Sequence, residues 1–289
     1  MKECVVIVGS FTRDLIEGAR VIGGPPYYSS MALLHHGCEN ILIVSPAEEP
    51  HLDFVQRTGL ELAIVGGSVP VFELKYINNT EREVRLLRRG TRIKLTSTLL
   101  DTIKGCAVIV SPVYKEVDLE ALQKLREYAN VLALDIQGFV RETTDSGAVR
   151  IRWSDDVYEA LRYADLFHAD LSEVPMFRSM NGAAQHLASY TRGIGLISHG
   201  EEGLIASIAG ELVYVPALPG IQGDSTGTGD ILLAITAYEL QRGTDPLKAV
   251  AMGAAAAGLR VSRAAPPWFS RFEVEILAEK LMMRSRRLH

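Results

Sequence analysis

Residues 223–234 read GDSTGTGDILLA, a glycine-rich turn followed directly by an apolar run of helical character. A glycine turn that opens a helix points backbone N–H groups and the positive end of the helix dipole at one place. That place suits an anion whose charge grows during reaction, as in phosphoryl transfer. Asp230, in the first turn, can accept a proton from an attacking hydroxyl. The pattern predicts an anion site with a base beside it; the alternative is a helix that merely caps its own N-terminus.

Short apolar runs recur on both sides of this stretch, and amphipathic segments of helical length separate many of them. The runs are near-continuous, as in strands covered on both faces. This order predicts an α/β fold with a mostly parallel central sheet flanked by helices. The expected strands are residues 4–8, 41–44, 107–110, 131–134, 166–169 and 194–197, and the expected helices are residues 28–36, 119–128, 155–162, 230–241, 246–261 and 272–284.

Residues 71–77 and 82–87 alternate apolar and charged side chains around an Asn-Asn-Thr turn, which predicts an inserted β-hairpin. A lone hairpin is marginally stable, so it must cover the main sheet, a substrate or a second copy of itself. We favour a lid at residues 69–95 on a core of residues 1–68 and 96–289, with a homodimer contact as the rival. A neighbouring basic cluster is interpreted as a solvated face rather than a phosphate contact: Arg85, Arg88, Arg89, Arg92 and Lys94.

The composition limits the class of protein, the partners and the cellular location that we expect. The 289 residues are 47% hydrophobic with a net charge of -5, which is typical of a soluble globular protein and excludes general disorder. The acidic balance makes nucleic acid an unexpected partner. The apolar runs are too short for a membrane span or a signal peptide, so we expect a cytoplasmic protein without a membrane partner. Cys4, Cys38 and Cys106 form no disulfide framework or zinc pattern, and we expect all three to be reduced.

Residues 224–230, DSTGTGD, resemble the D[ST]xGAGD signature of ribokinase-like (phosphofructokinase-B) carbohydrate kinases, with Thr228 where alanine is usual. Gly23-Gly24, followed by a helix, resembles that family's substrate loop. Asp14 stands after the first strand, where the family binds sugar hydroxyls. The order of elements agrees over nearly the whole chain. The resemblance implies a ribokinase-like fold with a hairpin lid, and a kinase that uses ATP and Mg²⁺.

The same resemblance assigns roles on the donor side. Asp230 becomes the catalytic base, and the anion hole is formed by Gly227, Thr228 and Gly229. The loop after residue 197 resembles a TxGxxG-like ATP loop, and the small residues 254–258 resemble a helix that walls the adenine pocket, although close helix packing explains them equally well. The residues assigned to ATP are Asp170, Ser198, Gly200, Gly203, Gly227 and Gly229.

Residues 170–173 resemble the family's NxxE motif, whose glutamate is associated with hydrated magnesium, so Glu173 is assigned to the metal through water. Asp170 stands where asparagine is usual. A carboxylate cannot donate a hydrogen bond to phosphate as an amide can, so this departure puts the role of Asp170 in doubt. Glu173 as a solvated glutamate at a helix start is the alternative.

Acceptor contacts are assigned to Asp14, Gly24, Tyr28, Gln137 and Arg141. Residues 23–29, 135–141 and 168–171 resemble the branch that contains myo-inositol kinases. We therefore expect phosphorylation of a hydroxyl of a small polyol or sugar, with myo-inositol first. One alternative is a nucleoside kinase of the same fold, and another is a non-catalytic nucleotide or sugar sensor. The aromatic residues available to stack on a base are Phe11, Tyr27, Tyr28, Phe72 and Tyr76.

Overall fold

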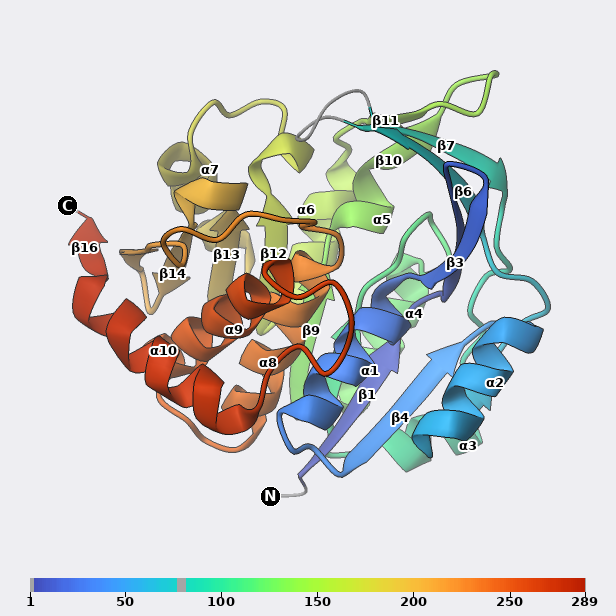
Figure 1. The fold of residues 1–289 in the computed structure, drawn as a ribbon, viewed down its shortest axis with the longest axis horizontal. Helices are drawn as coiled ribbons and strands as arrows, with labels where there is room; N and C mark the ends of the chain where they lie inside the picture. Colours follow the sequence, from blue (N-terminus) through green and yellow to red (C-terminus); the bar gives the residue numbers. More distant parts are fainter. Residues whose placement is uncertain (1–2, 77–81, 289) are drawn as a thin grey trace.

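The structure, a computed structural model, describes residues 3–76 and 82–288. Its main sheet contains β1 (Cys4–Val8), β4 (Asn40–Ser45), β5 (Glu61–Ile64), β8 (Ala107–Val110), β9 (Val131–Asp135), β12 (Leu166–Asp170), β13 (Ile194–Ser198), β14 (Leu204–Ile208), β15 (Glu211–Val215) and β16 (Arg286–Leu288). These ten strands lie in the order β16-β15-β14-β13-β12-β9-β8-β1-β4-β5 (Figure 1). From β5 to β13 neighbouring strands are parallel, and β14 to β16 extend the sheet in antiparallel fashion. The expected parallel α/β sheet is confirmed, and every expected strand is present.

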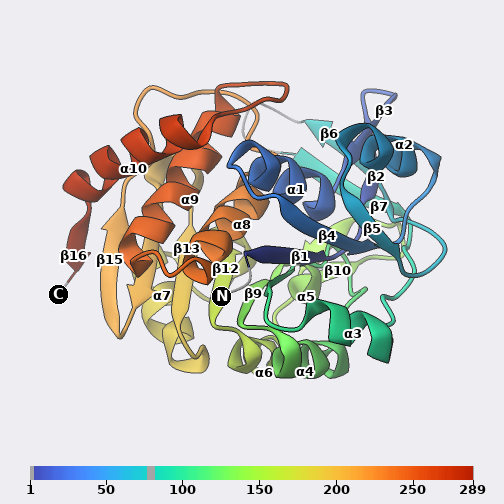
Figure 2. The ribbon, with the colours of Figure 1, turned by 90° about the horizontal axis from the view of Figure 1, so that it is seen from below.

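Helices cover both faces of this sheet, as Figure 2 shows edge-on. One face carries α1 (Pro25–His35), α2 (Glu49–Thr58), α8 (Thr228–Gln241), α9 (Pro246–Val261) and α10 (Arg271–Arg284), and the other carries α3 (Ser97–Ile103), α4 (Leu119–Tyr128), α6 (Asp155–Tyr163) and α7 (Met180–Leu187). A separate hydrophobic core lies on each face. α8 is buried along nearly its whole length between the sheet, α1 and α9, so the start of the helix has a fixed place at the sheet.

The helices begin where local chemistry satisfies their first N–H groups. The Asp118 carboxylate accepts from the Ala121 N–H at the start of α4, and Ser270 and Glu273 form a capping box at the start of α10. α1 begins at Pro25, three residues before the expected start, because proline is well suited to the first helical turn.

A second, four-stranded sheet lies beside the main one (Figure 1). It consists of β2 (Thr12–Ile16), β3 (Ala19–Gly23), β6 (Val71–Tyr76) and β7 (Arg82–Arg88), in the order β3-β2-β6-β7. β6 and β7 are the expected hairpin, and residues 77–81 between them lie outside the described residues. The sequence analysis did not predict β2 and β3, because residues 12–23 show little apolar alternation. We call the four strands the lid sheet.

The apolar face of the lid sheet is covered by the chain itself. Phe72, Leu74 and Leu86 are buried together with Val113, which follows β8. A small hairpin of β10 (Arg141–Thr143) and β11 (Val149–Ile151) lies against β7, and the Leu86 N–H donates to the Gly147 carbonyl at 2.8 Å. The lid therefore has an apolar partner without a second copy of the protein.

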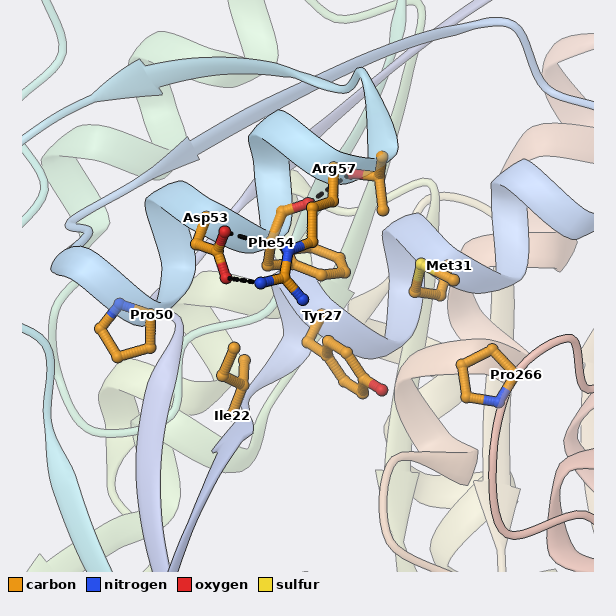
Figure 3. Close-up of a pocket in the computed structure, with 9 residues that line it drawn as sticks. Ile22, Tyr27, Met31, Pro50, Asp53, Phe54, Arg57 and Pro266 are labelled. Atoms are coloured by element: carbon orange, nitrogen blue, oxygen red, sulfur yellow. Dashed lines mark hydrogen bonds and ion pairs between the residues drawn. The ribbon is translucent and has the colours of Figure 1, made fainter.

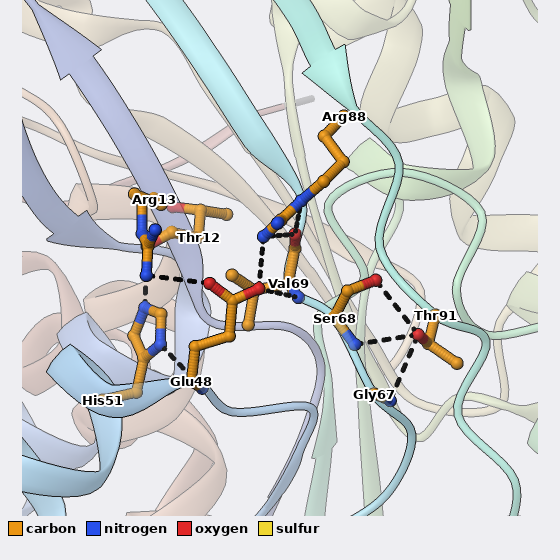
Figure 4. Close-up of polar contacts among 9 residues, drawn as sticks. All are labelled: Thr12, Arg13, Glu48, His51, Gly67, Ser68, Val69, Arg88 and Thr91. Atoms are coloured by element: carbon orange, nitrogen blue, oxygen red, sulfur yellow. Dashed lines mark hydrogen bonds and ion pairs between the residues drawn. The ribbon is translucent and has the colours of Figure 1, made fainter.

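One carboxylate ties the lid sheet to the core (Figure 4). Glu48, which caps α2, accepts from Arg13 of β2 at 2.8 Å and also from Arg88 of β7. The Val69 N–H, just before β6, donates to the same side chain at 3.4 Å. His51 in α2 adds a contact of 3.2 Å from its Nε2 to a backbone carbonyl of β2. The base of the lid is thus fixed to α2 by charge and hydrogen bonds.

The expectation of three reduced cysteines is wrong, because Cys4 and Cys106 form a disulfide. β1 and β8 are parallel neighbours with Val5 opposite Ala107, so the preceding cysteines lie opposite each other with Cα atoms 4.9 Å apart. That pairing depends on strand order, which the sequence does not reveal. Cys38 is free and buried. In residues 3–76 and 82–288, no helix is both long and apolar enough to cross a membrane.

Candidate active site

The turn before α8 needs glycine for two separate reasons. Gly227, directly before the helix, has φ of 80°, and an added Cβ would lie 2.2 Å from the Tyr28 ring. A Cβ at Gly229 would lie 2.7 Å from Cε1 of His168. Both glycines let other groups approach the backbone at the positive end of the helix, which favours anion binding there.

Asp230 lies buried in the first turn of α8. The Ser111 hydroxyl donates to its Oδ1 at 3.0 Å, and Gln137 Nε2 in turn donates to Ser111 at 3.4 Å. Burial, and next the charge of Asp135, raise the pKa of Asp230 to about 7, although the Ser111 hydrogen bond and the charges of His168 and Arg141 oppose the shift. A carboxylate with this pKa is suited to accept a proton near neutral pH.

A chain of polar side chains runs beside Asp230. His168 Nδ1 donates to Asp135 Oδ2 at 2.8 Å, and His168 Nε2 lies 2.9 Å from Ser198 Oγ. The Ser198 hydroxyl donates to Asp170 Oδ2 at 3.4 Å. Asp170 and Glu173 form the capping box of η1 (Leu171–Glu173), with the Asp170 N–H donating to Glu173 Oε2 at 3.1 Å. Burial, and next the charge of Asp135, raise the pKa of Glu173, whereas Arg141 opposes the shift.

The parallel sheet brings these residues together. Ser111 follows β8, Asp135 ends β9 and Ser198 ends β13, while His168 lies in the middle of β12 and Asp170 at its end. These four strands are direct neighbours, and all present their carboxyl ends at the same edge. The crevice at this edge is where ligands of α/β sheets bind.

An arginine holds the glycine-rich turn in place. Arg260 of α9 is buried, and its Nη2 lies 3.1 Å from Asp224 Oδ2. Its guanidinium lies 5.7 Å from the Tyr28 ring centroid and 5.2 Å from that of Trp268. Asp224 also accepts from the backbone N–H and hydroxyl of Thr226, at 2.9 and 2.6 Å. The contacts fix both the turn and the ring packed on it.

Three residues that we expect to bind the phosphoryl acceptor come from β2, the position directly after β3, and α1: Asp14, Gly24 and Tyr28. Asp14 is buried on β2, and a Cβ at Gly23 would lie 2.2 Å from its Oδ2. Gly24 precedes α1 with φ of 87°, and a Cβ there would lie 2.5 Å from the Ser10 carbonyl oxygen. Burial raises the pKa of Tyr28, and the charges of Asp224 and Asp14 add to the shift. The Tyr28 ring itself packs on the turn before α8, at Gly227.

Residues 98–266 match the model of the pfkB family of carbohydrate kinases. The chain belongs to this family. Its fold is ribokinase-like, as expected, and the family and fold together make it a sugar or polyol phosphotransferase. No curated protein matches the chain significantly in sequence.

Solved structures similar to this pfkB family kinase are kinases as well. A pyrophosphate-dependent kinase in the ribokinase family, complexed with a pyrophosphate analog and myo-inositol, gives a TM-score of 0.78 at 21% identity, covering 94% of this chain and 99% of that one. Ribokinase from Thermotoga maritima gives 0.72 at 15%, covering 96% and 99%. Phosphofructokinase-2 from Escherichia coli in complex with potassium gives 0.70 at 15%, with the same coverage. At these identities the likeness establishes the fold.

Two residues assigned to ATP lie in a local turn. Gly200 and Gly203 belong to the turn around η3 (Gly200–Glu202), where both have positive φ. The Gly203 N–H donates to the Gly200 carbonyl at 3.2 Å, and the His199 N–H donates to the Gly203 carbonyl at 2.9 Å. Of this loop only Ser198 has a hydrogen bond, within the described ranges, to the polar chain beside Asp230.

Three of the aromatic residues considered for base stacking belong to one cluster: Tyr27 and Tyr28 are in edge-to-face contact with ring centroids 5.1 Å apart, and Phe11 joins them through Phe54. Tyr27 lines a separate hollow of about 300 Å³ between α1 and α2, whose rim carries the Asp53–Arg57 ion pair (Figure 3). Phe11 is fully buried and stacked on His51 at 5.0 Å, and Phe72 packs inside the lid sheet. Only Tyr28 contacts the glycine-rich turn; the side chain of Tyr76 lies outside the described part of the structure.

The residues around Glu173 fit a magnesium ion held mainly by water and phosphate. Within residues 3–76 and 82–288, no three His, Cys, Asp or Glu side chains are placed to bind a metal together. Magnesium in kinases commonly keeps several waters and is bound by one or two carboxylates and the phosphates. Glu173 is the carboxylate that would hold such an ion, through water.

The sequence analysis missed Ser111, Asp135, His168 and Arg260 as members of the site. Ser111 and Asp135 lie at strand ends, so the rule that ligands bind beyond the carboxyl ends of parallel strands would have found them once the strand order was known. His168 lies inside β12, and its contact with Asp135 of β9 depends on the same strand order. Arg260 carried no signal, because an arginine near a helix end is usually solvent-exposed.

Proposed function

We propose that this pfkB family kinase transfers a phosphoryl group to a hydroxyl of a small polyol, with myo-inositol as the first candidate. The observation that carries the proposal is Asp230, a buried carboxylate with a pKa of about 7 in the first turn of α8, beside a turn that only glycine can form. A proton acceptor beside an anion site is what phosphoryl transfer to an alcohol requires.

In the proposed mechanism, Asp230 orients the acceptor hydroxyl and takes its proton as the oxygen attacks phosphorus. Ser111 fixes the rotamer of Asp230 through its 3.0 Å hydrogen bond, and Gln137 fixes Ser111. The backbone at Gly227, Thr228 and Gly229 stabilises the charge that moves onto the transferred oxygens. Magnesium, when bound with the phosphates near Glu173, supplies further neutralisation of that charge.

A neutral polyol suits the acceptor side. Asp14 offers carboxylate oxygens to hydroxyl groups, and Gln137 offers an amide that can donate and accept. Arg141 donates to the Val113 carbonyl at 3.3 Å and lies among the carboxylates Glu173 and Asp230, whose pKa values it lowers. The likeness to a kinase that was solved with myo-inositol supports the same substrate class.

ATP with magnesium is the donor we would test first, as the family resemblance implies. Pyrophosphate is the second, on two observations. A Cβ at Gly258 would lie 2.7 Å from Leu218 Cδ1, so a loop leucine covers the part of α9 that the resemblance assigns to adenine. One similar structure is also a pyrophosphate-dependent kinase.

A nucleoside acceptor is the less favoured alternative, because of the described aromatic side chains considered for stacking only Tyr28 contacts the glycine-rich turn. A lid contact between two copies is also less favoured, because Phe72, Leu74 and Leu86 are already packed on Val113. A pure sensor is disfavoured by Asp230, because keeping a buried carboxylate beside an anion site costs stability that binding alone does not require.

The deciding experiment is a panel of acceptors against two donors. The protein is incubated with ATP or pyrophosphate, and with myo-inositol, other polyols, pentoses, hexoses or nucleosides, while ADP or phosphate release is measured. We expect acceptor-dependent release that is highest with a polyol, and about 10²- to 10⁴-fold lower in Asp230→Asn. Preference for a nucleoside would refute the proposed acceptor class, and unchanged turnover in Asp230→Asn would refute the mechanism.

A further inference from the structure

The imidazole of His168 lies directly beneath the glycine-rich turn. The residue is 4% exposed and belongs to β12, and its Cε1 would be 2.7 Å from a Cβ at Gly229. A ring so close to the first turn of α8 shares the space in which the anion site is built. Whether this ring is neutral or charged therefore matters for any anion bound above it.

The hydrogen-bond partners of His168 indicate whether its ring carries one proton or two. The Asp135 carboxylate accepts only, so His168 Nδ1 must carry a proton across their 2.8 Å contact. Ser198 has one hydroxyl proton for two neighbours, Asp170 Oδ2 at 3.4 Å and His168 Nε2 at 2.9 Å. If Ser198 donates to Asp170, which can only accept, then His168 Nε2 must donate to Ser198. The doubly protonated ring is the form that satisfies all three contacts.

Further hydrogen bonds orient the Asp135 and Asp170 carboxylates so that each can accept a proton donor of this network. Asp135 Oδ1 accepts the Gln137 N–H at 2.9 Å, which leaves Oδ2 facing the imidazole. Asp170 Oδ1 accepts the N–H and hydroxyl of Ser172 at 3.0 and 2.6 Å, which leaves Oδ2 for Ser198. In the series of contacts Asp135–His168–Ser198–Asp170, the carboxylates at both ends accept hydrogen bonds, and His168 and Ser198 between them donate.

We propose that His168 is a buried imidazolium that acts as a positioning residue, supporting through Gly229 the anion bound at the start of α8. The role rests on the proposed phosphoryl transfer. A positive charge beneath the turn adds to the helix dipole where negative charge grows. Unlike the side chains of Asp230 and Glu173, the ring contacts neither acceptor nor donor, because Gly229 lies between.

The charges around the ring agree with this assignment. Burial opposes the charged ring, but the hydrogen bond and charge of Asp135, with the charges of Glu173 and Asp170, outweigh it, and the pKa of His168 is raised. Asp230 faces the ring from α8, and the charge of His168 lowers the pKa of Asp230. Arg141, whose charge also lowers the pKa values of Asp230 and Glu173, is the one other cation among the groups named here.

The first test reads the charge directly and needs no substrate. Long-range ¹H–¹⁵N spectra at pH 8 distinguish imidazole nitrogens that carry protons from those that do not, and the resonances missing in His168→Gln assign the ring. We expect two protonated nitrogens on His168. One bare nitrogen at pH 8 would overturn the proposal. Asp135→Asn, which keeps the ring in place, should produce that bare nitrogen and serves if His168→Gln does not fold.

The second test reads the anion site. Calorimetry with inorganic pyrophosphate and with ATP should show binding to the wild type that weakens at least about tenfold in His168→Gln, as expected for loss of a nearby charge. The matched control is His186→Gln on the exposed side of α7, which should bind within twofold of the wild type. Equal affinities in His168→Gln and the wild type, or a wild type that binds neither anion, would overturn the proposal.

A pH profile separates support of the reaction from support of the fold. Without the imidazolium, Asp230 faces Asp135 with less compensation, so the acid limb of kcat/KM should move to higher pH in His168→Gln. A merely structural role would lower activity without moving that limb, and would contradict the proposal. If no acceptor is phosphorylated at all, the proposed function fails, while the spectra and the anion affinities still decide the charge of His168.

Discussion

Replacing Asp230 by Asn should make the protein more stable while it removes activity. Burial raises the pKa of this carboxyl from 3.8 to about 7. Between those values the folded protein keeps a proton that the unfolded chain has released, so the free energy of unfolding falls as the pH rises. Each pH unit in that window costs about 1.4 kcal/mol, which gives about 4 kcal/mol at pH 8 and about 2 kcal/mol at pH 5.

The amide of Asn cannot ionise, yet its oxygen can still accept the Ser111 hydroxyl. The free energy of unfolding of Asp230→Asn should therefore exceed that of the wild type by about 4 kcal/mol at pH 8 and about 2 kcal/mol at pH 5. For a chain of 289 residues the entropy of unfolding is about 0.6 kcal/mol per kelvin, so the Tm should rise by about 7 °C at pH 8 and about 3 °C at pH 5. Thermal unfolding followed by circular dichroism at the two pH values measures the difference.

Glu239, on the same helix, provides a control because its pKa is lowered rather than raised, so that its neutral substitution should destabilise the protein. Burial opposes its charge, but hydrogen bonds from His36 and Thr244 and the charge of Arg271 lower its pKa from 4.5 to about 2. The stability that ionised Glu239 contributes is complete above pH 4.5 and is lost as the pH falls toward 2. Glu239→Gln should therefore lower the free energy of unfolding by about 3 kcal/mol at pH 8. A Tm gain in Asp230→Asn that is equal at both pH values, or a loss at pH 8, would refute the reasoning.

Three further results are expected. In Gly229→Ala, kcat should fall about 100-fold or more, because the new Cβ meets a buried ring at 2.7 Å, whereas Gly182→Ala, with its nearest atoms at 3.4 Å, should keep wild-type kinetics. The kcat/KM of the wild type should rise through about pH 7 as Asp230 ionises, and a flat profile from pH 5 to 9 would argue against this base. Unreduced, denatured protein should show one reactive thiol by thiol titration, and reduction of Cys4–Cys106 should cost about 2–4 kcal/mol in chemical denaturation because the bridge spans 102 residues. Three reactive thiols would contradict the disulfide.

The fold was largely predictable where local pattern is enough. The apolar runs predicted every strand of the main sheet from β1 to β13 except β5, and the ends of α4 and α9 agree with the predicted ends. The strands β2, β3 and β14 to β16 were missed, because short antiparallel strands depend on their neighbours more than on their own sequence. The disulfide was missed for the same reason, since it requires β1 and β8 to be adjacent.

The site was predictable to the extent that it follows from one motif. Residues 224–230 identified Asp230 and its glycines, and the structure places them at the start of a buried helix. The side chains around Asp230 come from β8, β9, β12 and β13, far apart in sequence. Asp135 and His168 each look ordinary in the chain, and their meaning comes from the 2.8 Å contact between them. Such pairings depend on strand order, which a single sequence does not contain.

Asp14 belongs to β2 of the lid sheet, whereas Asp230 belongs to α8 of the core. The two carboxylates proposed to act on the acceptor are therefore carried by different parts of the fold, and Glu48 ties the lid sheet to α2. Any rotation of the lid changes the distance between the group that recognises the acceptor and the group that deprotonates it. A polyol long enough to reach both would complete the site by bridging them, whereas a water molecule cannot, and selection against hydrolysis would then be a matter of molecular length.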